Sequence, residues 1–83
     1  MKKILICLEV PTISQSYEVY VPDFLQVGEL TRLLVRSVRE LSSGRYMPSD
    51  EVFLCAKAQD IVLNEHVTLA DCGIGHGDHL VMV

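Results

Sequence analysis

The spacing of the apolar residues changes once along this chain, and that change restricts the folds open to it. Two early runs, residues 2–10 and 17–21, alternate in a way that places successive side chains on opposite faces of a β-strand. The stretch between them, residues 11–16, has the composition of a turn. The two runs therefore predict an antiparallel hairpin. One of its faces would carry Ile4, Ile6 and Leu8 from the first strand and Tyr17, Val19 and Val21 from the second.

From residue 27 onward the apolar residues recur every three or four positions, which is the period of an α-helix. Asp23 or Gln26 would cap the start of this helix, and Gly44 would end it because glycine tolerates the left-handed backbone conformation. It is the one helix that the sequence pattern predicts. The apolar stripe consists of Val27, Leu30, Leu34, Val38 and Leu41.

Three short apolar runs complete the chain, at residues 51–58, 60–63 and 79–83, and each predicts a strand. One helix for four to five strands predicts an α+β fold, in which the helix packs across one face of a mixed sheet. The chain has 83 residues, of which 49% are hydrophobic. We therefore expect residues 1–83 to form a single domain around one core.

Composition and charge disfavour several classes of function. The net charge of −4 disfavours a nucleic-acid partner, because phosphate binding relies on an excess of lysine and arginine. Glu9 and Pro11 interrupt the N-terminal apolar run too early for a signal peptide or a membrane span, so we expect no membrane insertion. Cys7, Cys55 and Cys72 lack the spacing of a disulfide framework, which fits a reduced, cytoplasmic location.

A sheet covered by one helix leaves its other face open to solvent. The residues expected on that open face include Leu5, Cys7, Tyr20, Val81 and Val83. An apolar patch of this kind indicates a protein partner. Scattered apolar residues, which nearly every protein surface carries, are the alternative interpretation.

Arg32, Arg36 and Arg39 fall on the helix face opposite the apolar stripe. Their spacing of four and three residues places them in one row. Such a row is either a solvated helix face or a docking surface for an acidic partner, and the sequence leaves both interpretations open.

The closing segment "LADCGIGHGDHLVMV", residues 69–83, concentrates glycine, histidine and cysteine. A phosphate-binding loop would place its glycines before the N-terminus of a helix, but a strand follows these glycines. Cys72, His76 and His79, with His66 as a fourth, have the ligand atoms that zinc prefers, but no pair of cysteines completes a structural site.

A catalytic cysteine would need a base and an orienting group in a cleft, which a small sheet with one helix seldom offers. We therefore expect no catalytic residue, no cofactor and no metal in this segment. We interpret it as a pair of turns that place Leu69 and Ile74 in the core, with Asp78 bonded back to the loop backbone.

The order of hairpin, helix, strands and closing turn resembles ubiquitin. The positions that match the last core positions of ubiquitin-like domains are Leu69, Asp71, Ile74, Leu80 and Met82. The closing segment also resembles the ending of the YukD and EsaB family, small ubiquitin-like proteins encoded with type VII secretion systems of Gram-positive bacteria. The residues that carry this resemblance are Leu69, Asp71, Cys72, Gly73, Ile74, Gly77, Asp78 and Leu80.

The resemblance implies a ubiquitin-like β-grasp fold and a non-catalytic protein-interaction module. It would be a cytosolic accessory or regulatory component of a type VII (ESX-like) secretion system, with membrane or ATPase subunits of that system as its partners. The expected contacts are Leu5, Tyr20, Val81 and Val83 on the sheet, with Arg32, Arg36 and Arg39 as a second surface.

Ubiquitin and the sulfur carriers that resemble it act through a C-terminal glycine pair. This sequence ends at Val83 without such a pair, so we expect no conjugation to other proteins. A sulfur carrier or protein modifier is the alternative function, and a small metal-binding domain is a further one. Homodimerisation through an exposed sheet edge stays open.

Overall fold

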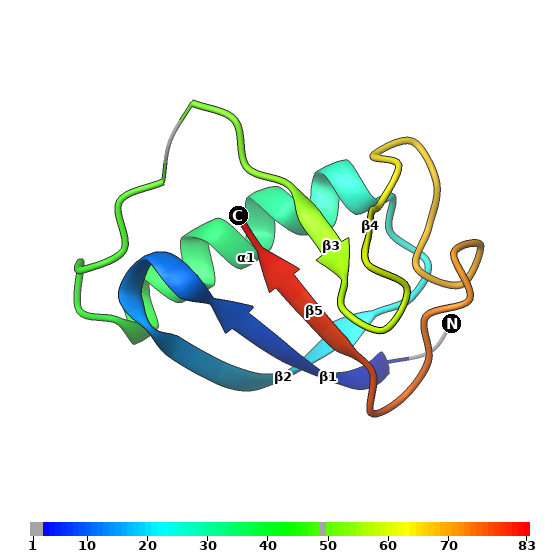
Figure 1. The fold of residues 1–83 in the computed structure, drawn as a ribbon, viewed down its shortest axis with the longest axis horizontal. Coiled ribbons are helices and arrows are strands. Elements are labelled where there is room, and N and C mark those ends of the chain that lie inside the picture. Colours follow the sequence, from blue (N-terminus) through cyan, green and yellow to red (C-terminus); the bar gives the residue numbers. More distant parts are fainter. Residues whose placement is uncertain (1–2, 49) are drawn as a thin grey trace.

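The computed structural model describes residues 3–48 and 50–83, so Lys2 of the predicted first strand lies outside the described residues. Its elements are β1 (Lys3–Val10), a 3-10 turn η1 (Pro11–Ile13), β2 (Gln15–Pro22), α1 (Val27–Leu41), β3 (Leu54–Ala56), β4 (Ile61–Val62) and β5 (His79–Met82). The strands form one sheet in the order β2-β1-β5-β3-β4. β1 and β5 are parallel and the other pairs are antiparallel, so the sheet is mixed. α1 lies across one face of it (Figure 1), which confirms the predicted α+β fold.

The N-terminal hairpin is longer than its side-chain pattern indicates. β1 and β2 pair without a break from Lys3 opposite Pro22 to Val10 opposite Gln15. The connection is η1 followed by Ser14 at φ 52°, whose N–H donates to the carbonyl of Pro11 at 3.0 Å. Residues 15 and 16, expected in the turn, belong to β2. Alternation reports only which side chains are buried, whereas the backbone ladder continues into these polar residues.

The start of α1 is held by backbone carbonyls instead of a capping side chain. Val27 N–H donates to Val67 O at 2.8 Å, and Gly28 N–H donates to Glu65 O at 2.9 Å. Of the two predicted caps, Asp23 and Gln26, it is Gln26 that occupies the N-cap position, but its side chain makes no capping bond. The loop that ends at Val67 already satisfies donors that a cap would otherwise have to satisfy.

The predicted apolar stripe of α1 is correct except at its last position. Leu41 is 56% exposed, because the helix ends there and the chain turns away. Tyr46, from the segment after the helix, joins the core instead and donates its N–H to Ser42 Oγ at 3.0 Å. Gly44 has a φ of 82° just beyond the helix, as expected of a terminating glycine. The buried stripe residues are Val27, Leu30, Leu34 and Val38.

Two turns in the closing segment position β5. Leu69 and Ile74 are 0% and 5% exposed, which confirms their predicted place in the core. Asp71, expected in the core, is exposed: its N–H donates to Thr68 Oγ1 at 3.1 Å, and its carboxylate accepts from Thr68 N–H at 3.4 Å. This reciprocal pair is the arrangement of a capping box, so Asp71 orders the turn. Asp78 Oδ2 accepts from a loop amide, the N–H of residue 75, at 2.7 Å, as predicted.

The strands predicted at residues 51–58 and 60–63 are present but shorter, as β3 and β4. The link between them is tight, because Asp60 adopts a φ of 54° and donates its N–H to Ala56 O at 2.8 Å. β4 lies at the edge of the sheet, where Ile61 and Val62 are 53% and 59% exposed. Their apolar character therefore does not reflect burial in the core. No helix in residues 3–48 and 50–83 has the length and hydropathy of a transmembrane segment.

Candidate interaction surface

The face of the sheet that points away from α1 is the first candidate surface. Burial alternates along β1, so that Leu5 and Cys7 lie on the face opposite the buried residues. Tyr20, which pairs with Leu5, lies on the same face and is 67% exposed. Val81 is partly buried between two buried residues of β5, and Val83 follows it at 50% exposed. All five apolar residues expected on the open face lie there.

One end of this face gathers apolar residues from three neighbouring segments. Val81 lies opposite Cys55 on β3, and Cys55 lies opposite Val62 on β4. Val83 exchanges two backbone hydrogen bonds with Phe53, at 2.8 and 2.9 Å. Side chains opposite one another in a sheet share a face. We call these five residues the Val81 cluster: Val81, Val83, Phe53, Cys55 and Val62.

Leu5 and Tyr20 form a separate group, the Leu5 cluster, at the other end of the face. β1 pairs with β5 so that Glu9, four residues beyond Leu5, stands level with the Val81 cluster. At roughly 3.3 Å per residue, the two clusters are about 13 Å apart along the strands. Between them lie the exposed residues Lys57 and His79, and Lys57 Nζ reaches across β5 to within 2.7 Å of Glu9 Oε2 on β1. The open face is therefore two apolar areas divided by a polar band.

Three members of the Val81 cluster were absent from the sequence prediction. Phe53 and Cys55 alternate with the buried residues Leu54 and Ala56. Alternation of this kind can in principle distinguish the two faces of a strand. Here both faces of the run are apolar, so the sequence does not indicate which residues point outward. Val62 lies in the strand predicted at residues 60–63, for which the sequence indicates no outward face; in the structure this strand, β4, has two residues.

The arginine row is a second surface, on the other side of the molecule. Arg32, Arg36 and Arg39 are all exposed on α1, as predicted. They line a shallow groove together with Val35 and Glu40. None of the ion pairs in the described part of the chain includes an arginine. Because α1 covers the opposite face of the sheet, one flat partner would not contact both the arginines and the open face.

Of the two histidines in the closing segment, His76 has a structural partner and His79 is exposed. His76 Nδ1 accepts the N–H of Leu5 at 3.1 Å, and Gly77 N–H donates to Leu5 O at 2.7 Å, so this loop is fastened to β1. His66 lies elsewhere, exposed, with Nε2 3.5 Å from Glu65 Oε1. Across residues 3–48 and 50–83, no three His, Cys, Asp or Glu side chains are grouped so that they could hold a metal ion.

Cys72 is partly buried and packs against the core. Burial raises the pKa of its thiol, and the neighbouring carboxylate of Asp71 raises it further. Reactive cysteines require the opposite, a lowered pKa that yields thiolate at neutral pH. The environment of Cys72 therefore does not activate it as a nucleophile.

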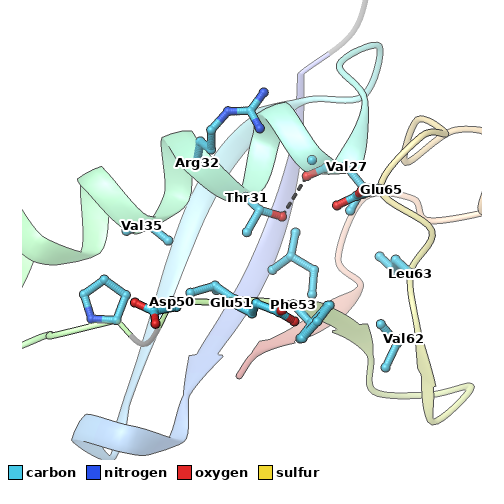
Figure 2. Close-up of a pocket in the computed structure, with 14 residues that line it drawn as sticks. Val27, Thr31, Arg32, Val35, Asp50, Glu51, Phe53, Val62, Leu63 and Glu65 are labelled. Carbon is cyan, nitrogen blue, oxygen red and sulfur yellow. Dashed lines mark hydrogen bonds between the residues drawn. The ribbon is translucent and has the colours of Figure 1, made fainter.

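A groove of about 770 Å³, which the sequence did not predict, runs between α1 and the chain that leads into β3. Figure 2 shows Val27, Thr31 and Val35 along the helix wall and Glu51 and Phe53 along the opposite wall. Residues 62–65 line it at one end. We call it the α1–β3 groove. It forms where α1 packs against residues 50–54 and 62–65, so no local sequence pattern marks it.

Known structures place this fold in a class. The ubiquitin-like domain of the Mycobacterium tuberculosis type VII secretion system protein ECCD1 superposes with a TM-score of 0.79 at 14% identity, over 100% of this chain and 99% of that one. The EccD5 ubiquitin-like domain from Mycobacterium xenopi gives 0.74 at 13% identity, over 100% and 94%. A ubiquitin from Caldiarchaeum subterraneum gives 0.69 at 21% identity, over 98% and 91%. The chain therefore has the ubiquitin-like β-grasp fold.

The family follows from the sequence. A family model described as "WXG100 protein secretion system (Wss), protein YukD" matches residues 5–82. The chain belongs to this YukD family of ubiquitin-like proteins associated with type VII secretion, which confirms the resemblance carried by the closing segment. A search of curated protein sequences found no match.

Proposed function

We propose that this protein is a non-catalytic interaction module, a cytosolic accessory or regulatory component of a type VII secretion system. It binds a membrane or ATPase subunit of that system through the open face of its sheet. The observation that carries the proposal is the Val81 cluster, an apolar area assembled from β3, β4 and β5 on the face that α1 does not cover. Family membership supports the secretion context, as does the ubiquitin-like domain of ECCD1, itself a secretion-system protein.

Val81 and Val83 are the central contacts in this proposal. Fully burying a valine contributes about 1.5–3 kcal/mol, and Val83 is already half buried, so each residue contributes about 1 kcal/mol to binding. Leu5 and Tyr20 supply a second anchor beyond the Glu9–Lys57 pair. A partner therefore needs two apolar contacts separated by polar groups. This requirement makes the interaction more specific than binding to a single continuous apolar patch.

The arginine row has a different role in the proposal. Arg32, Arg36 and Arg39 attract an acidic surface over a distance, which raises the association rate more than the affinity. They lie on α1, away from the sheet, so they contact another part of the same partner or a second subunit. Neither role needs a catalytic group, and the raised pKa of Cys72 agrees with that.

The test is capture of subunits from solubilised membranes of the native bacterium by tagged protein. Val81→Ser with Val83→Ser removes the centre of the cluster. The loss of about 2 kcal/mol corresponds to roughly thirtyfold weaker binding. Leu33→Ser with Leu41→Ser is the matched control, because these helix residues are 47% and 56% exposed and lie off the sheet.

The expected result is noncovalent recovery of secretion-system membrane or ATPase subunits by the wild type and the control variant, with loss in the Val81 and Val83 variant. Circular dichroism must show that the variant is folded. Equal recovery by all three proteins would refute the assignment of the sheet face. Covalent adducts, or recovery of an adenylating enzyme, would refute the interaction-module function in favour of a modifier or sulfur carrier.

A further inference from the structure

We propose that the α1–β3 groove is a second binding site, which takes an extended, lysine- or arginine-rich segment of a partner protein as an added strand. This site adjoins the sheet-face contacts of the proposed function, but it uses α1 and Val52, so it does not depend on them. Phe53 and Val62 lie where the two meet, since they belong to the Val81 cluster and also line the groove.

The groove has the size and lining of a peptide site. Its volume of about 770 Å³ falls within the range of roughly 300–1,000 Å³ typical of ligand pockets. The helix wall is apolar at Val27 and Val35, and Thr31 uses its hydroxyl to bond Val27 O at 2.7 Å (Figure 2). Val52 and Leu63 add apolar surface on the other walls. Side chains of alternate residues in a strand would pack here.

The backbone N–H and C=O of Val52, which lies on one wall just before β3, are free to pair with another chain. Phe53 donates its N–H to Val83 and accepts the N–H of Val83, so both of its polar backbone atoms face β5. Adjacent residues of an extended chain direct these atoms to opposite sides, so those of Val52 point away from β5, to the side on which Leu63 N–H bonds to Leu54 O and on which Leu63 and Glu65 line the groove. No backbone hydrogen bond among residues 3–48 and 50–83 uses the N–H or C=O of Val52. An unpaired edge is a template for another strand.

The charge of the groove determines which kind of partner segment it would bind. The carboxylates that line the groove are those of Asp50, Glu51 and Glu65, against the single cation of Arg32. In Figure 2 the guanidinium of Arg32 extends away from residues 50–53. Residues 50–83 as a whole carry six carboxylates and one lysine. The groove is therefore complementary to a basic strand and repels an acidic one.

Together these features define the occupant as a short β-strand in which apolar residues alternate with lysine or arginine. The apolar side chains point to the helix wall, and the basic ones pair with the carboxylates at the rim. Main-chain bonds to Val52 supply affinity that does not depend on side chains, which is the mode of recognition known as strand addition.

The experiment is a titration of ¹⁵N-labelled protein, followed by NMR, with a capped hexapeptide that alternates lysine and valine. We expect amide shifts centred on Val52 and on α1 residues along the groove, with binding that weakens as salt is added. A peptide with glutamate in place of lysine should bind at least about tenfold more weakly, because attraction becomes repulsion. A peptide with proline in place of valine lacks the N–H donors for pairing and should also lose binding.

Two protein variants complete the test. Asp50→Lys with Glu65→Lys should weaken binding of the lysine peptide by about tenfold, whereas Glu18→Lys with Glu40→Lys changes the net charge equally outside the groove and should leave it unchanged. Val81→Ser with Val83→Ser should also retain binding, so failure of this proposal and failure of the sheet-face proposal are distinguishable. No shift at Val52 with millimolar peptide, equal binding of the glutamate peptide, or equal loss in both charge variants would overturn the proposal.

Discussion

The sharpest test of the packing compares two leucines that the sequence pattern treats alike. Leu69 and Leu41 both occupy apolar positions of predicted core segments, yet Leu69 is 0% exposed and Leu41 is 56% exposed. Truncating a fully buried leucine to alanine removes its transfer free energy and leaves a cavity, which together cost about 2.7–5 kcal/mol. The same change at an exposed helix position usually stays within about 0.5 kcal/mol.

The difference is large relative to the stability of the fold. At about 0.05–0.15 kcal/mol per residue, a chain of 83 residues has a free energy of unfolding of about 4–12 kcal/mol. Leu69→Ala should therefore remove between about a quarter and all of it, and each kcal/mol lowers the Tm by about 4–8 °C for a domain of this size. Leu41→Ala should shift the Tm by no more than a few degrees.

Urea unfolding followed by far-ultraviolet circular dichroism measures both variants. The slope of the free energy against urea should stay constant, so that the change in midpoint reports stability. Equal destabilisation by the two substitutions would refute the burial assigned to these residues, and with it the position at which α1 ends. A stable Leu69→Ala variant would refute the role of the closing turn as part of the core.

Three other perturbations test separate features. Cys72 should react more slowly than an unfolded cysteine with iodoacetamide near pH 8, because its pKa is raised. Since the folded state disfavours its thiolate, the stability that this thiol contributes should be complete below its unfolded pKa and be lost as pH rises from there through the raised pKa of the folded state. Cys72→Ser should flatten the alkaline limb of a stability–pH profile, and an unchanged limb would contradict this. Gly77→Ala should lower the free energy of unfolding by about 1–2 kcal/mol, because residue 77 has a φ of 88°. Gly75 has no positive φ, so Gly75→Ala should leave the stability nearly unchanged. Equal urea midpoints for the two variants would contradict this loop geometry. Glu9→Gln should lower the free energy of unfolding by less than about 1 kcal/mol in low salt, because the ion pair with Lys57 is partly exposed. The loss should be smaller still in high salt, which screens the pair. A loss that does not depend on salt would contradict a Coulombic role.

The hairpin and the helix were predictable because each repeats a local period. Val38 and Leu8 are buried where the helix and strand patterns place them. The end of the helix was not predictable in the same way. Leu41 continues the period, but the helix ends at that residue, and Tyr46 enters the core from outside any periodic pattern. The helix start likewise depends on carbonyls from around Val67, forty residues away in the chain.

The candidate surface was predictable only in part, for a related reason. Alternation correctly placed Leu5 and Val81 on the face away from the helix, because it is a property of each strand alone. The division of that face by Glu9 and Lys57 depends on the register of β1, β5 and β3, which no single segment contains. The α1–β3 groove also depends on long-range packing, of α1 against residues 50–54 and 62–65. Features made by long-range register are thus the ones that required the structure.

The size of the molecule limits how these surfaces can be used. Its accessible surface is 5301 Å², and a typical stable interface covers about 800 Å² per partner, or roughly one seventh of it. A partner seated on the Val81 and Leu5 clusters would therefore leave the helix side, with the arginine row, free for another contact. The acidic α1–β3 groove and the arginine row adjoin along the same helix, where Arg32 and Val35 line both, and they have opposite charge preferences. One segment would not satisfy both, so simultaneous occupancy requires two segments of opposite charge, and the module is suited to hold two parts of an assembly together.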